Sequence, residues 1–82
     1  MEAIEVVVIR DGEQFIASDD VYLRYGVGQT ADEAKKDYAL SLLDYYKDLT
    51  EFDGRLSLQL QDDLGRLRML KRIEWQTTWT PS

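Results

Sequence analysis

Residues 25–49 read YGVGQTADEAKKDYALSLLDYYKDL, and they contain the strongest structural signals in the chain. Two glycines, Gly26 and Gly28, end an extended segment, and Thr30 stands three residues before Glu33. A Thr-x-x-Glu pattern is a capping box, in which the hydroxyl and the carboxylate each accept a bond from a free backbone N–H. Apolar residues then recur at helical spacing on one face: Ala34, Tyr38, Leu42, Tyr45 and Leu49. We predict a helix from about Thr30 to about Thr50.

The residues before this helix predict three antiparallel strands joined by short turns. The segment Ile4–Ile9 is rich in β-branched residues and apolar on both faces, which predicts a strand inside the sheet or under an interface. Asp11-Gly12 is a strong hairpin signal, so a second strand is expected at about Glu13–Ala17. After a polar turn at residues 18–20, alternation over residues 21–27 predicts the third strand.

Residues 51–55 break the helix, with Asp53-Gly54 as the turn. Leucines at helical spacing then predict a second helix over about 57–72, with Ser57 as its cap. Residues 73–80 alternate like a strand, which either returns to the sheet as its fourth strand or reaches across to another subunit. The predicted fold is one α+β domain over residues 1–82: a three-stranded antiparallel meander covered by a long helix, then a second helix and a fourth strand.

The composition excludes several classes of function. The 82 residues contain no cysteine and no histidine, so there is no disulfide, no thiolate nucleophile and no imidazole base or metal ligand. No apolar run has the length of a membrane span, and the N-terminal residues lack the basic flank of a signal peptide. We therefore expect a cytoplasmic protein without a membrane segment.

Negative charge is concentrated in the first two thirds of the chain. Residues 1–54 hold 5 Lys and Arg against 13 Asp and Glu, a net charge of −8, whereas residues 55–82 carry +2. An acidic body disfavours direct binding of phosphate groups and suits a basic partner, although solubility explains the same charge equally well. The residues expected to contact such a partner are acidic loop residues: Asp11, Glu13, Asp19 and Asp20.

Three patterns suggest chemistry, but a structural explanation is favoured for each. Gly26-x-Gly28 lacks the remainder of a phosphate-binding loop, so backbone geometry is the preferred explanation. Nothing near the acidic pairs at 19–20 and 62–63 completes a metal site or a catalytic site. The basic residues of the second helix suit its C-terminal dipole better than nucleic acid: Arg66, Arg68, Lys71 and Arg72. We predict no cofactor, no metal and no catalysis.

The chain also carries more apolar surface than one small domain covers easily. A second helical strip lies about 100° round from the first, and two tryptophans follow the second helix. Exposed apolar patches of this kind usually mark interfaces. We therefore predict a homodimer, whose contact includes residues of this strip or of the tail: Ala39, Leu43, Tyr46, Trp75 and Trp79.

The pattern GxGxTxxEAxxD, continuing into xxxSLxDYY, resembles the HicB-like antitoxins of toxin–antitoxin pairs. The residues that carry it begin with Gly26, Gly28, Thr30, Glu33 and Ala34. The resemblance covers about residues 4–49 and implies a three-strand, one-helix, one-strand fold, described in the family as a degraded ribonuclease-H-like domain. It also implies binding to HicA, a small basic toxin that cleaves mRNA.

Two features of this chain depart from the family pattern. The Pro-Gly commonly found between the second and third strands is replaced by residues 20–23, DVYL, and a separate C-terminal DNA-binding domain is not expected. The sequence therefore predicts a short HicB-like antitoxin or a stand-alone relative that acts by binding protein. The alternatives are a degenerate ribonuclease-H-like nuclease that uses metal, and a structural homo-oligomer without a toxin partner.

Overall fold

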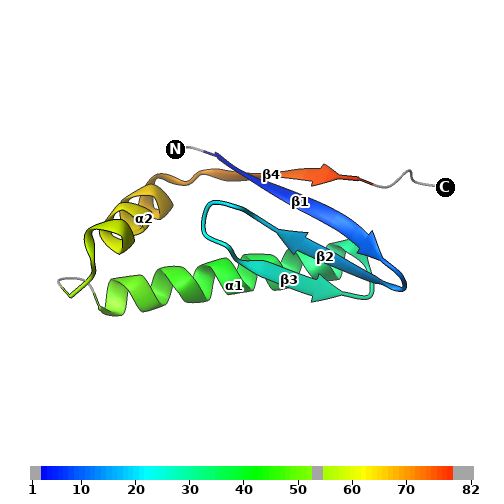
Figure 1. The fold of residues 1–82 in the computed structure, drawn as a ribbon, viewed down its shortest axis with the longest axis horizontal. Coiled ribbons are helices and arrows are strands. Elements are labelled where there is room, and N and C mark those ends of the chain that lie inside the picture. The colour runs from blue at the N-terminus through cyan, green and yellow to red at the C-terminus, as the bar shows by residue number, and fades with distance from the viewer. Residues whose placement is uncertain (1–2, 53–54, 79–82) are drawn as a thin grey trace.

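The computed structural model describes residues 3–52 and 55–78. It has the predicted α+β fold, with one mixed sheet of strand order β3-β2-β1-β4; the first helix packs against this sheet, and the second helix packs against the first (Figure 1). The elements in chain order are β1 (Ala3–Asp11), β2 (Gln14–Ser18), β3 (Tyr25–Gly28), α1 (Ala31–Glu51), α2 (Leu58–Met69) and β4 (Arg72–Thr77).

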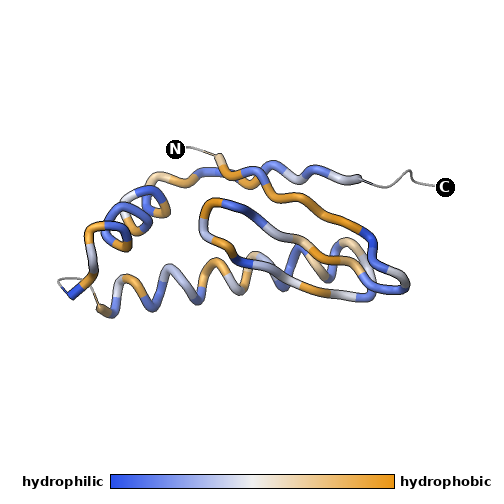
Figure 2. The backbone as a smooth tube through the Cα atoms, in the orientation of Figure 1, coloured by the Kyte–Doolittle hydropathy of each residue, from blue (hydrophilic) through white to orange (hydrophobic). Residues whose placement is uncertain are grey.

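β1 lies in the interior of the sheet, as its two apolar faces predict. Ile4, Val6 and Val8 point to the helix side and are fully buried there. β2 pairs antiparallel with one edge of β1, and β4 pairs parallel with the other. Figure 2 shows β1 as the longest hydrophobic stretch of the sheet.

The hairpin between β1 and β2 forms where Asp11-Gly12 predicts it. Asp11 pairs with Gln14, so Gly12 and Glu13 are the two turn residues. Gly12 has a φ of +64°, a conformation that residues with a Cβ rarely adopt. β2 begins one residue later than predicted because Glu13 belongs to the turn.

The third strand is shorter than the predicted 21–27, because residues 21–24 form a loop. Leu23, expected to alternate with the strand, has a φ of +58° and is 74% exposed. The cause is Asp19, whose carboxylate accepts bonds from the backbone N–H groups of Val21, Tyr22 and Arg24. These bonds hold the backbone in a turn, which competes with strand pairing.

α1 begins at the predicted cap. The Thr30 hydroxyl accepts the N–H of Glu33 at 3.1 Å, and the Glu33 carboxylate accepts the N–H of Gln29 at 3.0 Å. The reciprocal bond therefore reaches one residue before the cap, but both partners of the capping box act as predicted. Ala34, Tyr38, Leu42 and Leu49 are buried along one face of α1, and Tyr45 is partly buried beside them.

Gly26 and Gly28 are required by close packing between β3 and α1. A Cβ at Gly26 would lie 2.6 Å from the carbonyl oxygen of Ala34, and one at Gly28 would lie 2.6 Å from the Ala34 nitrogen. A positive φ at Gly26, one possible reason for a glycine there, is not found; among the described glycines only Gly12 has one. The motif therefore lets the backbone of a strand touch the backbone of a helix.

α2 folds back toward the C-terminal half of α1, and the chain then returns to the sheet. Ser57 caps α2 as predicted, and Leu64 and Leu67 are buried. The helix ends at Met69, three residues before the predicted end, because Arg72 already begins β4. β4 confirms the first of the two predictions for the tail, since it is the fourth strand of the sheet.

Candidate functional site

One face of the sheet is left uncovered by the helices. Since alternate residues point to opposite faces, the strand register places ten residues of β1, β2 and β3 on this side: Ala3, the pair Asp11 and Gln14 that closes the hairpin, and seven others. We define these seven as the open face: Glu5, Val7, Ile9, Ile16, Ser18, Tyr25 and Val27. Ile9, Ile16 and Val27 are paired side by side across the three strands.

The middle of the open face is apolar and partly accessible to solvent. Val7, Ile9 and Val27 are 37–38% exposed, and Tyr25 is 66% exposed. An uncovered face of an antiparallel sheet normally carries polar residues. A row of β-branched side chains across three strands is therefore the kind of exposed apolar patch that marks a binding surface.

Acidic residues lie at both ends of the open face. Asp11 and Glu13 stand at the β1–β2 hairpin, whereas Asp20 follows β2 at the opposite end of the sheet. There Asp20 joins Glu5 in lining a hollow of about 200 Å³, together with Val7, Ser18 and Asp19. The four predicted partner-binding residues are thus divided between two ends of one surface.

Glu5 was missed by the sequence analysis, which considered only acidic residues in loops. The signal was present in β1, because Glu5 alternates with Val7 and Ile9 and must share their face. An acidic side chain inside a strand becomes accessible only when the helices cover the other side. The sequence does not show which side of the sheet the helices cover, so the accessibility of Glu5 could not be predicted before the packing was known.

Asp19 has a structural role in the described loop. Its side chain is buried, with 8% of the residue exposed, and its two carboxylate oxygens accept the three backbone N–H bonds of the 19–24 turn. Burial raises the pKa of Tyr38 above its usual range, and the nearby Asp19 carboxylate adds to this increase. A contact between Asp19 and a partner stays a prediction.

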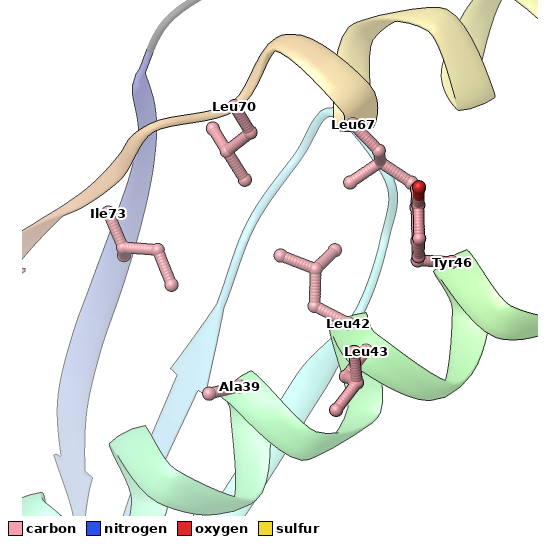
Figure 3. Close-up of a pocket in the computed structure, with 7 residues that line it drawn as sticks. All are labelled: Ala39, Leu42, Leu43, Tyr46, Leu67, Leu70 and Ile73. Carbon is pink, nitrogen blue, oxygen red and sulfur yellow. The ribbon is translucent and has the colours of Figure 1, made fainter.

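A second accessible surface is an apolar groove beside α1. The strip residues Ala39, Leu43 and Tyr46 form one wall of the groove, as Figure 3 shows. Its volume is about 280 Å³, and α2, the segment after it and β4 complete the lining with Leu67, Leu70 and Ile73 beside Leu42. The second strip of α1 is therefore only partly covered, with Leu43 45% exposed.

Of the two tail tryptophans, the structure describes Trp75. Trp75 lies on β4, where its ring packs edge-on against Tyr38 with 6.0 Å between the centroids and the Lys35 ammonium lies 5.6 Å from its ring centroid. Trp79 lies outside the described residues. Trp75 thus belongs partly to the domain's own core, and its contribution to a dimer contact stays a prediction.

The acidic pair at residues 62–63 makes contacts within the domain. Asp62 pairs with Arg66 at 3.0 Å, and Asp63 accepts a 2.7 Å hydrogen bond from the Tyr45 hydroxyl. Burial and then this hydrogen bond raise the pKa of Tyr45 to about 12. Within residues 3–52 and 55–78, no three acidic side chains come together in a way that could hold a metal ion.

Comparison with known proteins adds no relative. No family model, no curated protein and no solved structure matches the chain. The resemblance to HicB-like antitoxins therefore stays a prediction that rests on the motif around Gly26 and Thr30. In the part of the chain that the structure describes, no helix combines the length and the apolar character needed to cross a bilayer.

Proposed function

We propose that this chain is a cytoplasmic protein-binding domain, an HicB-like antitoxin or a stand-alone relative, that neutralises a small basic toxin of the HicA type. The observation that carries the proposal is the open face, an apolar row across three strands with acidic residues at both ends. The element order supports the proposal in part: three strands, a long helix and a last strand occur as the resemblance implies, with α2 as an additional helix before the last strand.

The apolar row provides the contact area. A typical interface has an apolar centre surrounded by a polar rim, and Ile9, Ile16 and Val27 occupy the centre of this surface. Aromatic residues are enriched at such contacts because they bury a large area at a low entropic cost. Tyr25, which is well exposed at the edge of the row, is the aromatic residue best placed to bind a partner.

The acidic ends provide selectivity. A toxin that cleaves RNA presents basic groups for phosphates, and carboxylates at both ends of the open face can occupy those groups. Charges at the rim of an interface act mainly on the association rate and on the choice of partner. Binding should therefore weaken as salt screens these charges, with a Debye length of about 8 Å at physiological ionic strength.

The proposal can be tested with the protein encoded by the adjacent gene, provided that it is small and basic. The two purified proteins should bind in a calorimeter, and an equimolar amount of this chain should stop the partner from cleaving RNA. Failure to inhibit cleavage at saturating concentration would refute the antitoxin role. Lack of a small basic neighbour counts against it as well.

A matched pair of variants locates the contact. Ile9→Asp places a charge in the centre of the open face and should weaken binding at least about tenfold, in line with a central interface residue. Leu40→Asp is the control, because Leu40 is also exposed but lies on α1, which packs against the opposite side of the sheet. Equal affinities of the two variants would show that another surface binds the toxin.

The nuclease alternative gives a different result in the same assay. The chain alone, with Mg²⁺ or Mn²⁺, should leave single-stranded RNA, double-stranded RNA and an RNA–DNA hybrid intact. Cleavage that disappears in Asp20→Asn protein would favour the nuclease, since Asp20 and Glu5 share the hollow at the end of the open face.

A further inference from the structure

The two edges of the sheet differ in whether their backbone groups are covered. At the β3 edge, the N–H of Val27 donates to the Asp37 carboxylate of α1 at 2.9 Å. This outward-pointing backbone group therefore already has a hydrogen-bond partner. β4 pairs with β1 on one side only. On its other side, β4 has no neighbouring strand and makes no backbone–backbone hydrogen bond within the described residues. An uncovered edge strand is a template for pairing with another chain.

The helices also leave the region beside β4 uncovered. The backbone of α1 packs against β3 and β2 and does not come near β4, so the apolar groove lies beside this strand. Ile73 of β4 is one of the groove residues and is only partly buried. Two independent features, an unpaired strand edge and an incompletely covered apolar surface, therefore meet at β4 (Figures 1 and 3).

The charges of β4 fit a second copy of the same strand. Arg72 and Glu74 lie on the same face, with their charged groups 3.1 Å apart, and both side chains are accessible at 63% and 47%. In an antiparallel pair related by a two-fold axis at Ile73, Arg72 of each copy stands directly opposite Glu74 of the other. Opposite charges in this position stabilise a strand pair, and like charges destabilise it.

We propose that two copies of this chain associate through β4, as antiparallel neighbours about a two-fold axis at Ile73. The pairing joins both sheets into one and satisfies the outer backbone groups of both β4 strands. On the helix side, the two Ile73 side chains meet at the border of the two apolar grooves. A shift of the axis to Glu74 is disfavoured, because the two Glu74 carboxylates would then face each other.

The register is tested by complementary charge reversal. Arg72→Glu gives a chain with two negative charges in β4, and Glu74→Arg gives one with two positive charges. In a dimer of either variant alone, like charges face each other at two positions across the two-fold axis. The dissociation constant of this dimer should therefore be at least about tenfold higher than that of the wild-type dimer. A mixture of the two restores both opposite pairs, and the mixed dimer should form at about the wild-type concentration.

Sedimentation equilibrium measures dimerisation between about 1 and about 200 micromolar, a range that suits a small interface at the weak end of specific contacts. A fluorophore on one variant distinguishes the mixed dimer from the homodimers. The control mixture reverses two charges at the distant hairpin, Arg10→Glu with Glu13→Arg, and should leave dimerisation unchanged. Recovery on mixing cannot come from the contact between Arg72 and Glu74 within one chain, because both single variants lose that contact.

Three results would overturn the proposal. A monomer throughout the concentration range rejects the dimer. A dimer that neither Arg72→Glu nor Glu74→Arg weakens uses another surface, and one that Leu43→Asp abolishes uses the helix strip instead. The proposal does not depend on toxin binding. Ile9 lies five residues along β1 from Ile4, the partner of Ile73, so Ile9→Asp should leave the dimer intact.

Discussion

Replacing Gly26 with alanine tests the close contact between β3 and α1. A Cβ at this position would lie less than 3.0 Å from three backbone atoms of α1, namely the nitrogen and Cα of Tyr38 and the carbonyl oxygen of Ala34. Side chains can rotate away from a new methyl group, but helix backbone cannot. The strand and the helix must then separate, which removes packing around the fully buried Tyr38.

The magnitude follows from the cost of adding atoms to a packed interior. One extra methylene group in a core typically costs about 1–3 kcal/mol, and a clash between backbones belongs at the upper end. We therefore expect Gly26→Ala to lower the free energy of unfolding by about 3 kcal/mol. The whole free energy of unfolding of a domain of this size is about 4–12 kcal/mol, so the expected loss is a large fraction of it.

Gly65→Ala is the matched control, because the same change occurs in a different environment. Gly65 lies within α2, and a Cβ there would meet no atom within 4 Å. Alanine is favoured over glycine inside a helix by about 1 kcal/mol, so this variant should be more stable than the wild type. The two substitutions should change the unfolding free energy in opposite directions.

Urea unfolding followed by circular dichroism measures both effects. With a slope of about 1 kcal/mol per molar urea, the midpoint should fall by about 3 M for Gly26→Ala and rise by about 1 M for Gly65→Ala. A Gly26→Ala protein with a midpoint within about 0.5 M of the wild type would refute the inference that backbone contact requires this glycine.

Three further substitutions address other parts of the fold. Thr30→Ala removes the cap of α1 and should cost about 1 kcal/mol in urea unfolding; an unchanged midpoint would mean that the cap contributes nothing. Asp19→Ala leaves the three N–H groups of the 19–24 turn without their acceptor and should cost about 3 kcal/mol, whereas Asp20→Ala, the neighbouring control, should cost little. Because the pKa of Tyr45 is raised to about 12, its neutral form stabilises the fold fully below about pH 10, and this contribution is lost as pH rises toward 12. Tyr45→Phe should therefore flatten the loss of stability above pH 10, and an ultraviolet titration of this variant should show one late-ionising tyrosine fewer than that of the wild type; identical pH profiles would contradict this.

Local patterns predicted those parts of the fold that depend on neighbouring residues. The cap at Thr30, the hairpin at Gly12 and the buried face of α1 each follow from a few residues in sequence. The loop at residues 21–24 could not be predicted in this way. Its apolar alternation is typical of a strand, and the three hydrogen bonds to Asp19 that prevent pairing depend on the orientation of one side chain.

The surfaces required knowledge of the packing. The second strip of α1 was evident from its spacing, but the sequence does not show that Leu67, Leu70 and Ile73 would line the same groove. The open face was inaccessible to prediction for a related reason. β1 is apolar on both sides, so its pattern alone does not indicate which side the helices cover.

The position of β4 has a consequence for how the chain folds during its synthesis. Ala3 pairs with Arg72, so each residue of β1 that pairs with β4 is made 69 residues before its partner. The hairpin and α1 can form early because their contacts are local, whereas pairing between the two distant strands must come later and is intrinsically slow. Until β4 has paired, the backbone groups along one edge of β1 have no partner. An unpaired edge can pair with the strands of other nascent chains. Translation rate and chaperone supply should therefore influence the yield of this protein more strongly than its small size suggests.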